Sequence, residues 1–247
     1  MKPLLRAELI KLRTTRTFAG LAGAAIATSL LITVLVALLT EPTEDSVLVD
    51  VFTTDLSGLF IFVLAIIGIT GEWRHRTITS SLLAAPDRLR FLAAKTLAFA
   101  AAGGILSVLI AVAVAIVGSV ILSIRDLPLP EAGELVAQMG RNALVAALTG
   151  ALAVGLAALV RNQVIAVVGL LLVGLLIEPT VTALLPEVGR YGPFVALPTA
   201  AADIPADAAG LGDVDLLAPG LATLAMMAWI GVAFAAGHAL LRGRDVH

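Results

Sequence analysis

The chain contains no cysteine, so neither a disulfide nor a thiolate metal site can form. Aromatic residues make up only 4% of it and charged residues only 14%, whereas a soluble domain carries about a quarter charged residues. The hydrophobic content is 60% and the mean hydropathy is +1.05. So large an apolar excess excludes an ordinary soluble domain and indicates a protein embedded in lipid.

The motifs of common catalytic and nucleotide-binding sites are also missing. The sequence has no G-x-x-x-x-G-K-[ST], no G-x-G-x-x-G that opens a helix, no G-x-S-x-G and no H-E-x-x-H. The three histidines, His75, His238 and His247, are scattered, whereas a hydrolytic metal site needs clustered ligands. We therefore expect no catalytic residue, no metal, no cofactor bound by this chain and no nucleic-acid partner. The chain is predicted not to be an enzyme.

Six apolar stretches dominate the chain. A membrane helix needs roughly 20 apolar residues to cross a hydrocarbon core of about 30 Å, and backbone in lipid must satisfy its own hydrogen bonds. The sequence therefore predicts an all-α integral membrane protein with a single transmembrane domain over residues 1–247. The predicted spans are about 18–39, 51–71, 92–124, 140–160, 162–178 and 216–241.

Charges of opposite sign are separated along the chain. Apart from Arg125, Arg141 and Arg190, the basic residues lie before the first span, between the second and third, at Arg161 and at the C-terminus. Most acidic residues lie in the other connections. Because cytoplasmic loops carry the excess of Lys and Arg, both termini are predicted to be cytoplasmic. We expect a multi-pass protein of the cell (plasma) membrane, namely the bacterial inner membrane.

Residues 2–16 form a basic segment before the first span. Leu5, Leu9 and Leu12 recur at helical spacing, and Leu4 and Ile10 lie off this stripe, so the amphipathicity is moderate. The pattern predicts a helix in the inner headgroup region, with its cations facing anionic lipid. A solvated tail that only follows the charge rule is the alternative.

The fifth span is short, and an apolar but broken stretch follows it. Glu178-Pro179 is predicted to end the helix near the outer leaflet. Irregular backbone at membrane depth is tolerated only where protein covers it or it lines a cavity. The segment 179–202 is therefore predicted to be a re-entrant element before the sixth span, and an ordinary external loop is the alternative.

Two ionisable residues within the spans are functional candidates. Asp55 is expected in the first turn of its helix, where a carboxylate also satisfies free N–H groups. Glu178 is expected at the outer mouth, where it could pair with Arg141 or Arg190. The candidates for a pathway or an outer gate are Asp55, Glu178, Pro179, Tyr191 and Phe194.

The connection between the second and third spans is basic and strongly patterned. Trp73 suits the headgroup boundary, residues 77–84 can form two helical turns, and Pro86 stops them. Asp87 can then cap the next helix. A short helix held at the membrane surface can receive a push from a partner. A basic loop that only sets the topology is the alternative.

This connection resembles the first cytoplasmic loop of ABC type 2 permeases, the membrane subunits of ATP-binding-cassette exporters. The run is G-E-W-R-H-R-T-I-T-S-S-L-L-A-A-P-D-R-L-R-F-L-A-A-K. The N-terminal L-R-A-E-L-I-K-L-R-T-T-R is similar to their opening segment, and six spans with a broken element before the sixth also agree. The positions that match the loop pattern are Glu72, Thr77, Ile78, Leu82, Leu83, Pro86, Arg88 and Lys95.

The resemblance implies a division of labour. A separate cytoplasmic ATPase subunit would hold ATP and Mg and dock under the helix 77–84, anchored by Glu72, Arg74 and Arg76. A second permease chain, identical or paralogous, would complete the translocation pathway. The residues expected to couple the chain to the ATPase are Glu72, Arg74, Arg76, Thr77, Ile78, Leu82, Leu83, Pro86 and Arg88.

Two other functions stay open. A membrane-anchoring or assembly subunit would need no pathway. An ion-coupled secondary transporter would need charges at the middle of the bilayer, whereas Asp55 and Glu178 are expected nearer the outer surface. The spans are poor in polar residues, which favours an amphipathic or lipid-like cargo.

Overall fold

The structure is a computed structural model that describes residues 2–74, 87–160 and 162–242. In these ranges the chain is helical and contains no strand. The elements run α1 (Lys2–Thr14), α2 (Arg16–Leu39), α3 (Val47–Phe52), α4 (Ser57–Arg74), α6 (Arg88–Ile124), α7 (Ala132–Ala157), α8 (Gln163–Leu172), η1 (Val173–Ile177), α9 (Glu178–Leu184), α10 (Pro186–Gly189), α11 (Ala196–Ala201) and α12 (Pro219–Arg242).

Within the described residues, six helical stretches are long and apolar enough to cross a membrane, as predicted. They are Arg16–Leu39, Val47–Arg74, Arg88–Ile124, Ala132–Ala157, Gln163–Leu184 and Pro219–Leu240. Leucines, isoleucines and valines are exposed along α2, α6, α8 and α12, where water would be unfavourable and lipid is not. These observations indicate a multi-pass membrane protein.

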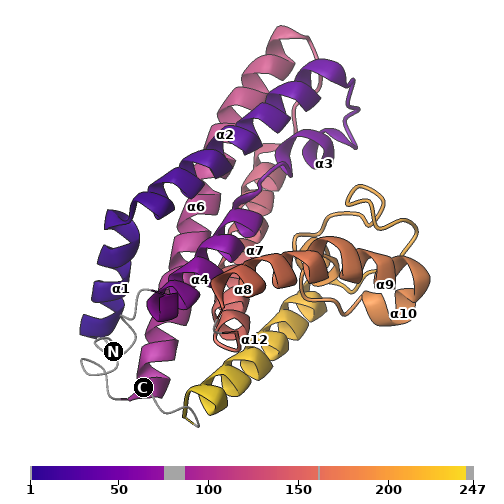
Figure 1. The fold of residues 1–247 in the computed structure, drawn as a ribbon. Coiled ribbons are helices and arrows are strands. Elements are labelled where there is room, and N and C mark those ends of the chain that lie inside the picture. The colour runs from indigo at the N-terminus through magenta and orange to yellow at the C-terminus, as the bar shows by residue number, and fades with distance from the viewer. Residues whose placement is uncertain (1, 75–86, 161, 243–247) are drawn as a thin grey trace.

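The helices α4, α6 and α7 form the centre of the bundle (Figure 1). The α6 and α7 backbones approach each other closely at Gly103 and Gly150. A Cβ at Gly103 would lie 2.5 Å from the carbonyl oxygen of Ala146, and a Cβ at Gly150 would lie 2.6 Å from that of Phe99. Since larger residues cannot fit there, the two glycines permit the tight antiparallel packing on which the other helices rest.

The second membrane-length stretch is broken between α3 and α4, over residues 53–56. The freed backbone and side chains bond to α2 near its middle: Leu56 N–H donates to Ser29 Oγ over 3.0 Å, and the Thr33 and Thr54 hydroxyls are 2.6 Å apart. Protein partners therefore replace the missing helical bonds, which makes the break tolerable at this depth.

The fifth stretch continues beyond the predicted end. The expectation that the helix stops at Glu178-Pro179 is wrong, because α8, η1 and α9 form one stretch of 22 residues. The Glu178 N–H donates to the Val173 carbonyl, five residues back. Proline cannot donate a backbone hydrogen bond and clashes with the carbonyl four residues back, and the wider π-helical turn lets the helix pass Pro179.

After α9 the chain turns back into the bundle. Phe194 packs edge-to-face on Phe62 of α4, with ring centroids 5.6 Å apart, and lies against Gly174 in η1. Trp229 Nε1 of α12 donates to the Tyr191 carbonyl over 3.0 Å. This returning segment, residues 185–202, thus reaches the middle of the α8–α9 stretch and is covered by α4 and α12.

The N-terminal segment is the helix α1, as predicted, and it packs on the bundle. Leu4 lies beside Phe91 and Trp73, and Leu12 joins the main core, whereas Leu9 of the predicted stripe is 38% exposed. Helical spacing shows that apolar residues share a face, but the packing partner decides which face is covered.

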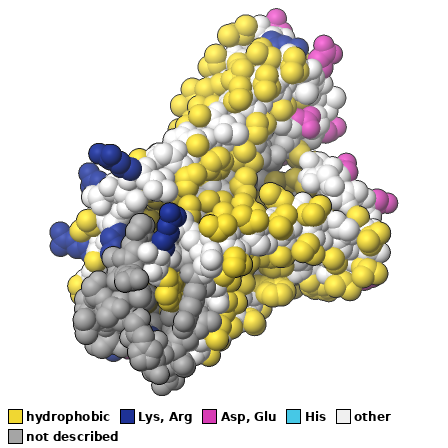
Figure 2. Space-filling model, in the orientation of Figure 1, with side chains coloured by type: hydrophobic (Ala, Val, Ile, Leu, Met, Phe, Trp, Pro, Cys, Tyr) yellow, Lys and Arg dark blue, Asp and Glu magenta, His cyan; other side chains and the backbone are white. Residues whose placement is uncertain are grey.

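Charges gather at opposite ends of the described structure (Figure 2). Lys and Arg side chains lie around α1, the end of α4 and the start of α6, which we call the basic end. Acidic side chains gather around α3 and the loops near α9, which we call the acidic end, and an apolar surface lies between the two ends. The α1 helix and the C-terminal end of α12 lie at the basic end (Figure 1).

Candidate functional site

Two regions bring ionisable side chains into the interior, one at the basic end and one at the middle of the bundle. We call the first the ion cluster, formed by Glu8, Lys11, Glu72 and Lys95. We call the second the Asp55 cavity.

In the ion cluster, Lys95 Nζ lies 2.8 Å from Glu8 Oε2 and 2.7 Å from Glu72 Oε1. Lys11 Nζ lies 2.8 Å from Glu8 Oε1 and 3.3 Å from Glu72 Oε1. Lys95 is only 2% exposed, and each carboxylate is 7% exposed. Two ammonium groups thus face two carboxylates, and the cluster ties α1 to the end of α4 and the start of α6.

The contacts within the ion cluster favour the charged forms of both Glu8 and Lys11. Burial raises the pKa of Glu8, but the Lys95 ammonium and hydrogen bonds from Lys11 and Lys95 outweigh it, so the pKa of Glu8 lies below its ordinary value. Burial lowers the pKa of Lys11, but the Glu8 and Glu72 carboxylates outweigh it, so the pKa of Lys11 lies above its ordinary value. Both shifts favour the charged forms of Glu8 and Lys11.

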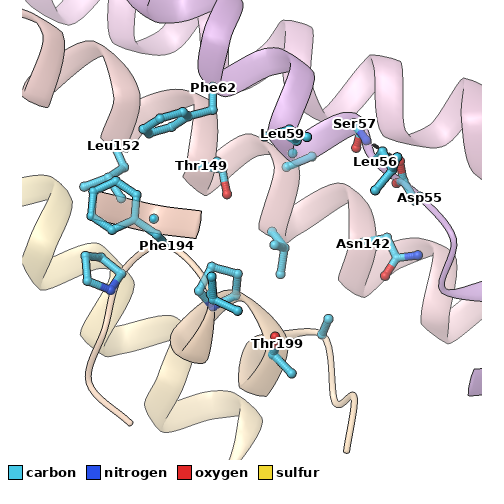
Figure 3. Close-up of a pocket in the computed structure, with 18 of the residues that line it drawn as sticks. Asp55, Leu56, Ser57, Leu59, Phe62, Asn142, Thr149, Leu152, Phe194 and Thr199 are labelled. Carbon is cyan, nitrogen blue, oxygen red and sulfur yellow. Dashed lines mark hydrogen bonds between the residues drawn. The ribbon is translucent and has the colours of Figure 1, made fainter. Parts of the chain in front are cut away.

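The Asp55 cavity lies between α4, α7, α8, η1 and the returning segment, and has a volume of about 360 Å³ (Figure 3). Asp55 Oδ1 accepts a 2.8 Å hydrogen bond from the Ser57 N–H, and Oδ2 accepts one from Ser107 Oγ. Asp55 thus bonds the N-terminal turn of α4, as the sequence predicted. Ser107 lies near the middle of α6, so Asp55 is deeper in the bundle than the expected position near the outer surface.

Glu178 holds the returning segment in position. Its carboxylate accepts hydrogen bonds from the backbone N–H groups of Phe194, Val195 and Ala196, at 2.8, 2.6 and 3.0 Å. The prediction that it pairs with Arg141 or Arg190 is wrong: Arg141 pairs with Asp203 at 3.0 Å and Arg190 with Glu187 at 3.2 Å. Glu178 thus fastens to α9 the returning segment, whose residues Pro193, Phe194 and Val195 line the cavity.

The other predicted gate residues are spread over this region. Pro179 lies inside the α8–α9 helical stretch, and Phe194 lines the cavity. Tyr191 is 46% exposed, and its side chain is not among those that line the cavity. Of the five candidates, Asp55 and Phe194 face the same space.

The predicted coupling residues fall partly outside the described residues: Arg76, Thr77, Ile78, Leu82, Leu83 and Pro86. Arg74 ends α4, and its Nη1 lies 3.5 Å from Gln163 Oε1. Arg88 begins α6, and Asp87 caps this helix by accepting from the N–H groups of Leu89 and Arg90, as predicted. Glu72 points into the ion cluster, so its described partners belong to this chain.

Sequence reasoning did not identify Glu8, Ser107 and Asn142 as members of these two regions. A signal existed for Glu8, which is the only acidic residue before Glu41 and lies in an otherwise basic segment. Ser107 and Asn142 have no such signal, because a single polar residue in an apolar helix does not indicate which neighbour it faces.

The fold and these two regions define the class: a helical, multi-pass membrane protein whose interior holds ionisable groups. No protein-family model matches the chain, and no curated protein matches it. Within the described residues, no group of three or more His, Cys, Asp or Glu side chains could hold a metal ion.

Proposed function

We propose that this chain is the permease subunit of an ABC exporter, coupled to a separate ATPase. The resemblance of the loop after α4 and of the N-terminal segment to ABC type 2 permeases motivates the proposal. The observation that carries it is the ion cluster. Glu72 lies before the predicted coupling helix and Lys95 after it, and Lys95 bonds both to Glu72 and to Glu8 of α1.

The ion cluster joins the two flanks of the predicted coupling loop to one another. A push on a loop moves the helices behind it only if the flanks of the loop are held in fixed relation. Here Lys95 bonds directly to Glu72 across the loop, and Glu8 adds α1 to the same unit. ATP-driven closure of the ATPases would then move α1, α4 and α6 together and shift the bundle between two states.

In this proposal the basic end faces the cytoplasm, α1 lies at the inner membrane surface and two permease chains form the pathway. ATP and Mg belong to the ATPase. The returning segment after α9, residues 185–202, serves as the re-entrant outer gate, which the contacts of Phe194 with Phe62 and Gly174 support.

The test is a mild-detergent purification of the tagged chain from its native membrane, with mass spectrometry of the co-purifying proteins. We expect a near-stoichiometric ATPase subunit. Reproducible absence of one from a folded, monodisperse preparation would contradict the proposal and favour an anchoring subunit or an ion-coupled transporter.

A charge reversal of Arg74 and Arg76 to Glu tests the docking surface. The double variant should lose the ATPase and keep the fold. The matched control reverses Arg6 and Arg13, two exposed residues of α1, and should keep the ATPase. Retention of the ATPase by the first variant would show that the anchor residues are wrongly chosen.

The position of Asp55 favours a second candidate, an ion-coupled secondary transporter. Asp55 lies at the level of the middle of α6 and not near its outer end. Ionisable residues at such depth are typical of ion-coupled transport. Vesicles that contain only this chain separate the two functions: uptake driven by a proton or sodium gradient supports this candidate, and dependence on the ATPase and ATP supports the exporter.

A further inference from the structure

The two ends of the Asp55 cavity differ in polarity. Its walls are mostly apolar, and Phe62, Leu152 and Phe194 lie together on one side in Figure 3. Polar side chains lie at the other end, where Asp55 and Asn142 are close to one another in the view of Figure 3. A cavity of about 360 Å³ with apolar walls and a few convergent polar groups has the usual form of a small-molecule site.

The Asp55 carboxylate brings a negative charge to this cavity without a counter-charge. Its two described hydrogen bonds come from a neutral N–H and a neutral hydroxyl, and no ion pair to it is found in the parts of the chain that the structure describes. A carboxylate at the middle of a membrane bundle is unfavourable unless it is compensated. A cation in the adjoining space would supply the missing charge.

Asn142 is a second, independent sign of a ligand. It is only 8% exposed and lines the cavity. Gln138 Nε2 donates to Asn142 Oδ1 over 2.9 Å, whereas Asn142 Nδ2 donates to no group within the described ranges. Since Asn142 lines the cavity, this donor is available to an acceptor group on a ligand.

The returning segment forms one wall of the cavity. Gln138 Nε2 also donates to the Ala202 carbonyl over 3.0 Å, and the neighbouring Arg141 pairs with Asp203. Together with the three bonds of Glu178, these contacts hold both ends of the segment 194–203 in place. The space is therefore a built cavity with fixed walls and not a gap between loosely packed helices.

We propose that the Asp55 cavity binds a lipophilic cation: a ligand with a positive centre at Asp55, an acceptor group toward Asn142 and an apolar or aromatic body between Phe62 and Phe194. Aromatic faces add attraction for such a ligand. That this ligand is the exported cargo rests on the function proposed above, whereas binding to the cavity does not.

The probe is tetraphenylphosphonium, a permanent cation with an aromatic body, and its counterpart is tetraphenylborate, an anion of nearly the same shape. Binding of each to the purified full-length chain in lipid nanodiscs is measured by equilibrium dialysis, with empty nanodiscs as the blank. We expect saturable binding of the cation and none of the anion above the blank. Equal binding of both, or no saturable binding of the cation, would overturn the proposal.

Asp55→Asn removes the charge and keeps the shape. Asparagine can also accept the Ser57 N–H bond, so the turn is retained. The variant should bind the cation at least ten-fold more weakly, and Asp55→Asn combined with Asn142→Asp should recover part of the binding, because it returns a carboxylate to the same cavity. Unchanged binding by Asp55→Asn would overturn the proposal.

Thr149→Lys provides a test that does not depend on Asp55. Thr149 lines the cavity from α7, and a lysine there places an ammonium group in the position of the ligand. It should abolish binding of the cation, and undiminished binding would overturn the proposal. Because none of these measurements involves an ATPase, failure here and failure of the exporter function are separate results.

Discussion

The ion cluster and the Asp55 cavity place carboxylates in the interior under opposite conditions. In the cluster, Glu8 and Glu72 face Lys11 and Lys95 at 2.7–3.3 Å, and Lys95 is only 2% exposed. In the cavity, Asp55 faces neutral donors and an open volume. In the ion cluster, side chains of the chain itself balance the negative charges. In the Asp55 cavity, we infer that a ligand supplies the balancing charge.

This difference separates structural from binding roles. A balanced buried cluster is strongly destabilised when one partner is removed, because a charge is left without compensation. Where a carboxylate has no opposite charge beside it, removal of its charge should lower the stability of the protein only a little. Substitutions in the two regions should therefore differ in their effect on stability, and the difference measures which region holds the fold together.

The largest effect is expected from Lys95→Met. It leaves Glu8 and Glu72 with Lys11 as their remaining cation in the cluster, and loss of a buried partner costs about 3–5 kcal/mol. The thermal unfolding midpoint in detergent should fall markedly. The control is Arg90→Met, since Arg90 pairs with Asp87 on the surface and such pairs contribute about 1 kcal/mol or less. Equal losses in the two variants would contradict the structural role of the cluster.

Glu178→Gln should have the next largest effect. The amide keeps one acceptor oxygen for three backbone donors, and a lost hydrogen bond to a charged group costs about 2 kcal/mol. Amide hydrogen exchange should rise in the segment 192–202 and remain unchanged in α6. Glu187→Gln is the control, because the Glu187 side chain is 85% exposed. Unchanged protection of the segment would show that other contacts hold it.

Attachment of α1 should depend on pH at both extremes. The pKa of Glu8 is lowered, so its contribution is complete above its ordinary value of 4.5 and is lost as the pH falls through the lower value in the folded protein. The pKa of Lys11 is raised, so its contribution is complete below 10.5 and is lost as the pH rises through the higher value.

Trp73 fluorescence in a Trp229→Phe background reports this change, because Trp73 lies with Leu4 of α1 against Phe91. The emission should be constant at neutral pH and change at the two extremes. Glu8→Gln should remove the acid transition. An acid transition centred above pH 4.5 would contradict the lowered pKa of Glu8.

The smallest effect is expected from Asp55→Asn, which should change the free energy of unfolding by less than about 1 kcal/mol, because asparagine keeps the turn at the start of α4. The same variant should lose cation binding. A stability loss as large as that of Lys95→Met would show that Asp55 is a structural residue, and the contrast between the two regions would fail.

Much of the fold was predictable, because the apolar runs are long and unambiguous. The helix ends and breaks were not. Pro179 is a strong stop signal, yet the helix passes it by a π-helical turn that no local pattern predicts. The break at residues 53–56 depends on Ser29 and Thr33, which are distant in the sequence. Asp55 and Glu178 were identified as candidates, and the bond of Asp55 to the first turn of its helix was predicted, but Ser107 and the backbone partners of Glu178 were not.

Only the tertiary structure decided that Lys95 joins Glu8 and Glu72, that Glu178 binds backbone N–H groups and that Asp55 faces a cavity. These pairings depend on how helices far apart in the sequence pack against one another. Their energies come from distance and burial, which composition and spacing do not contain.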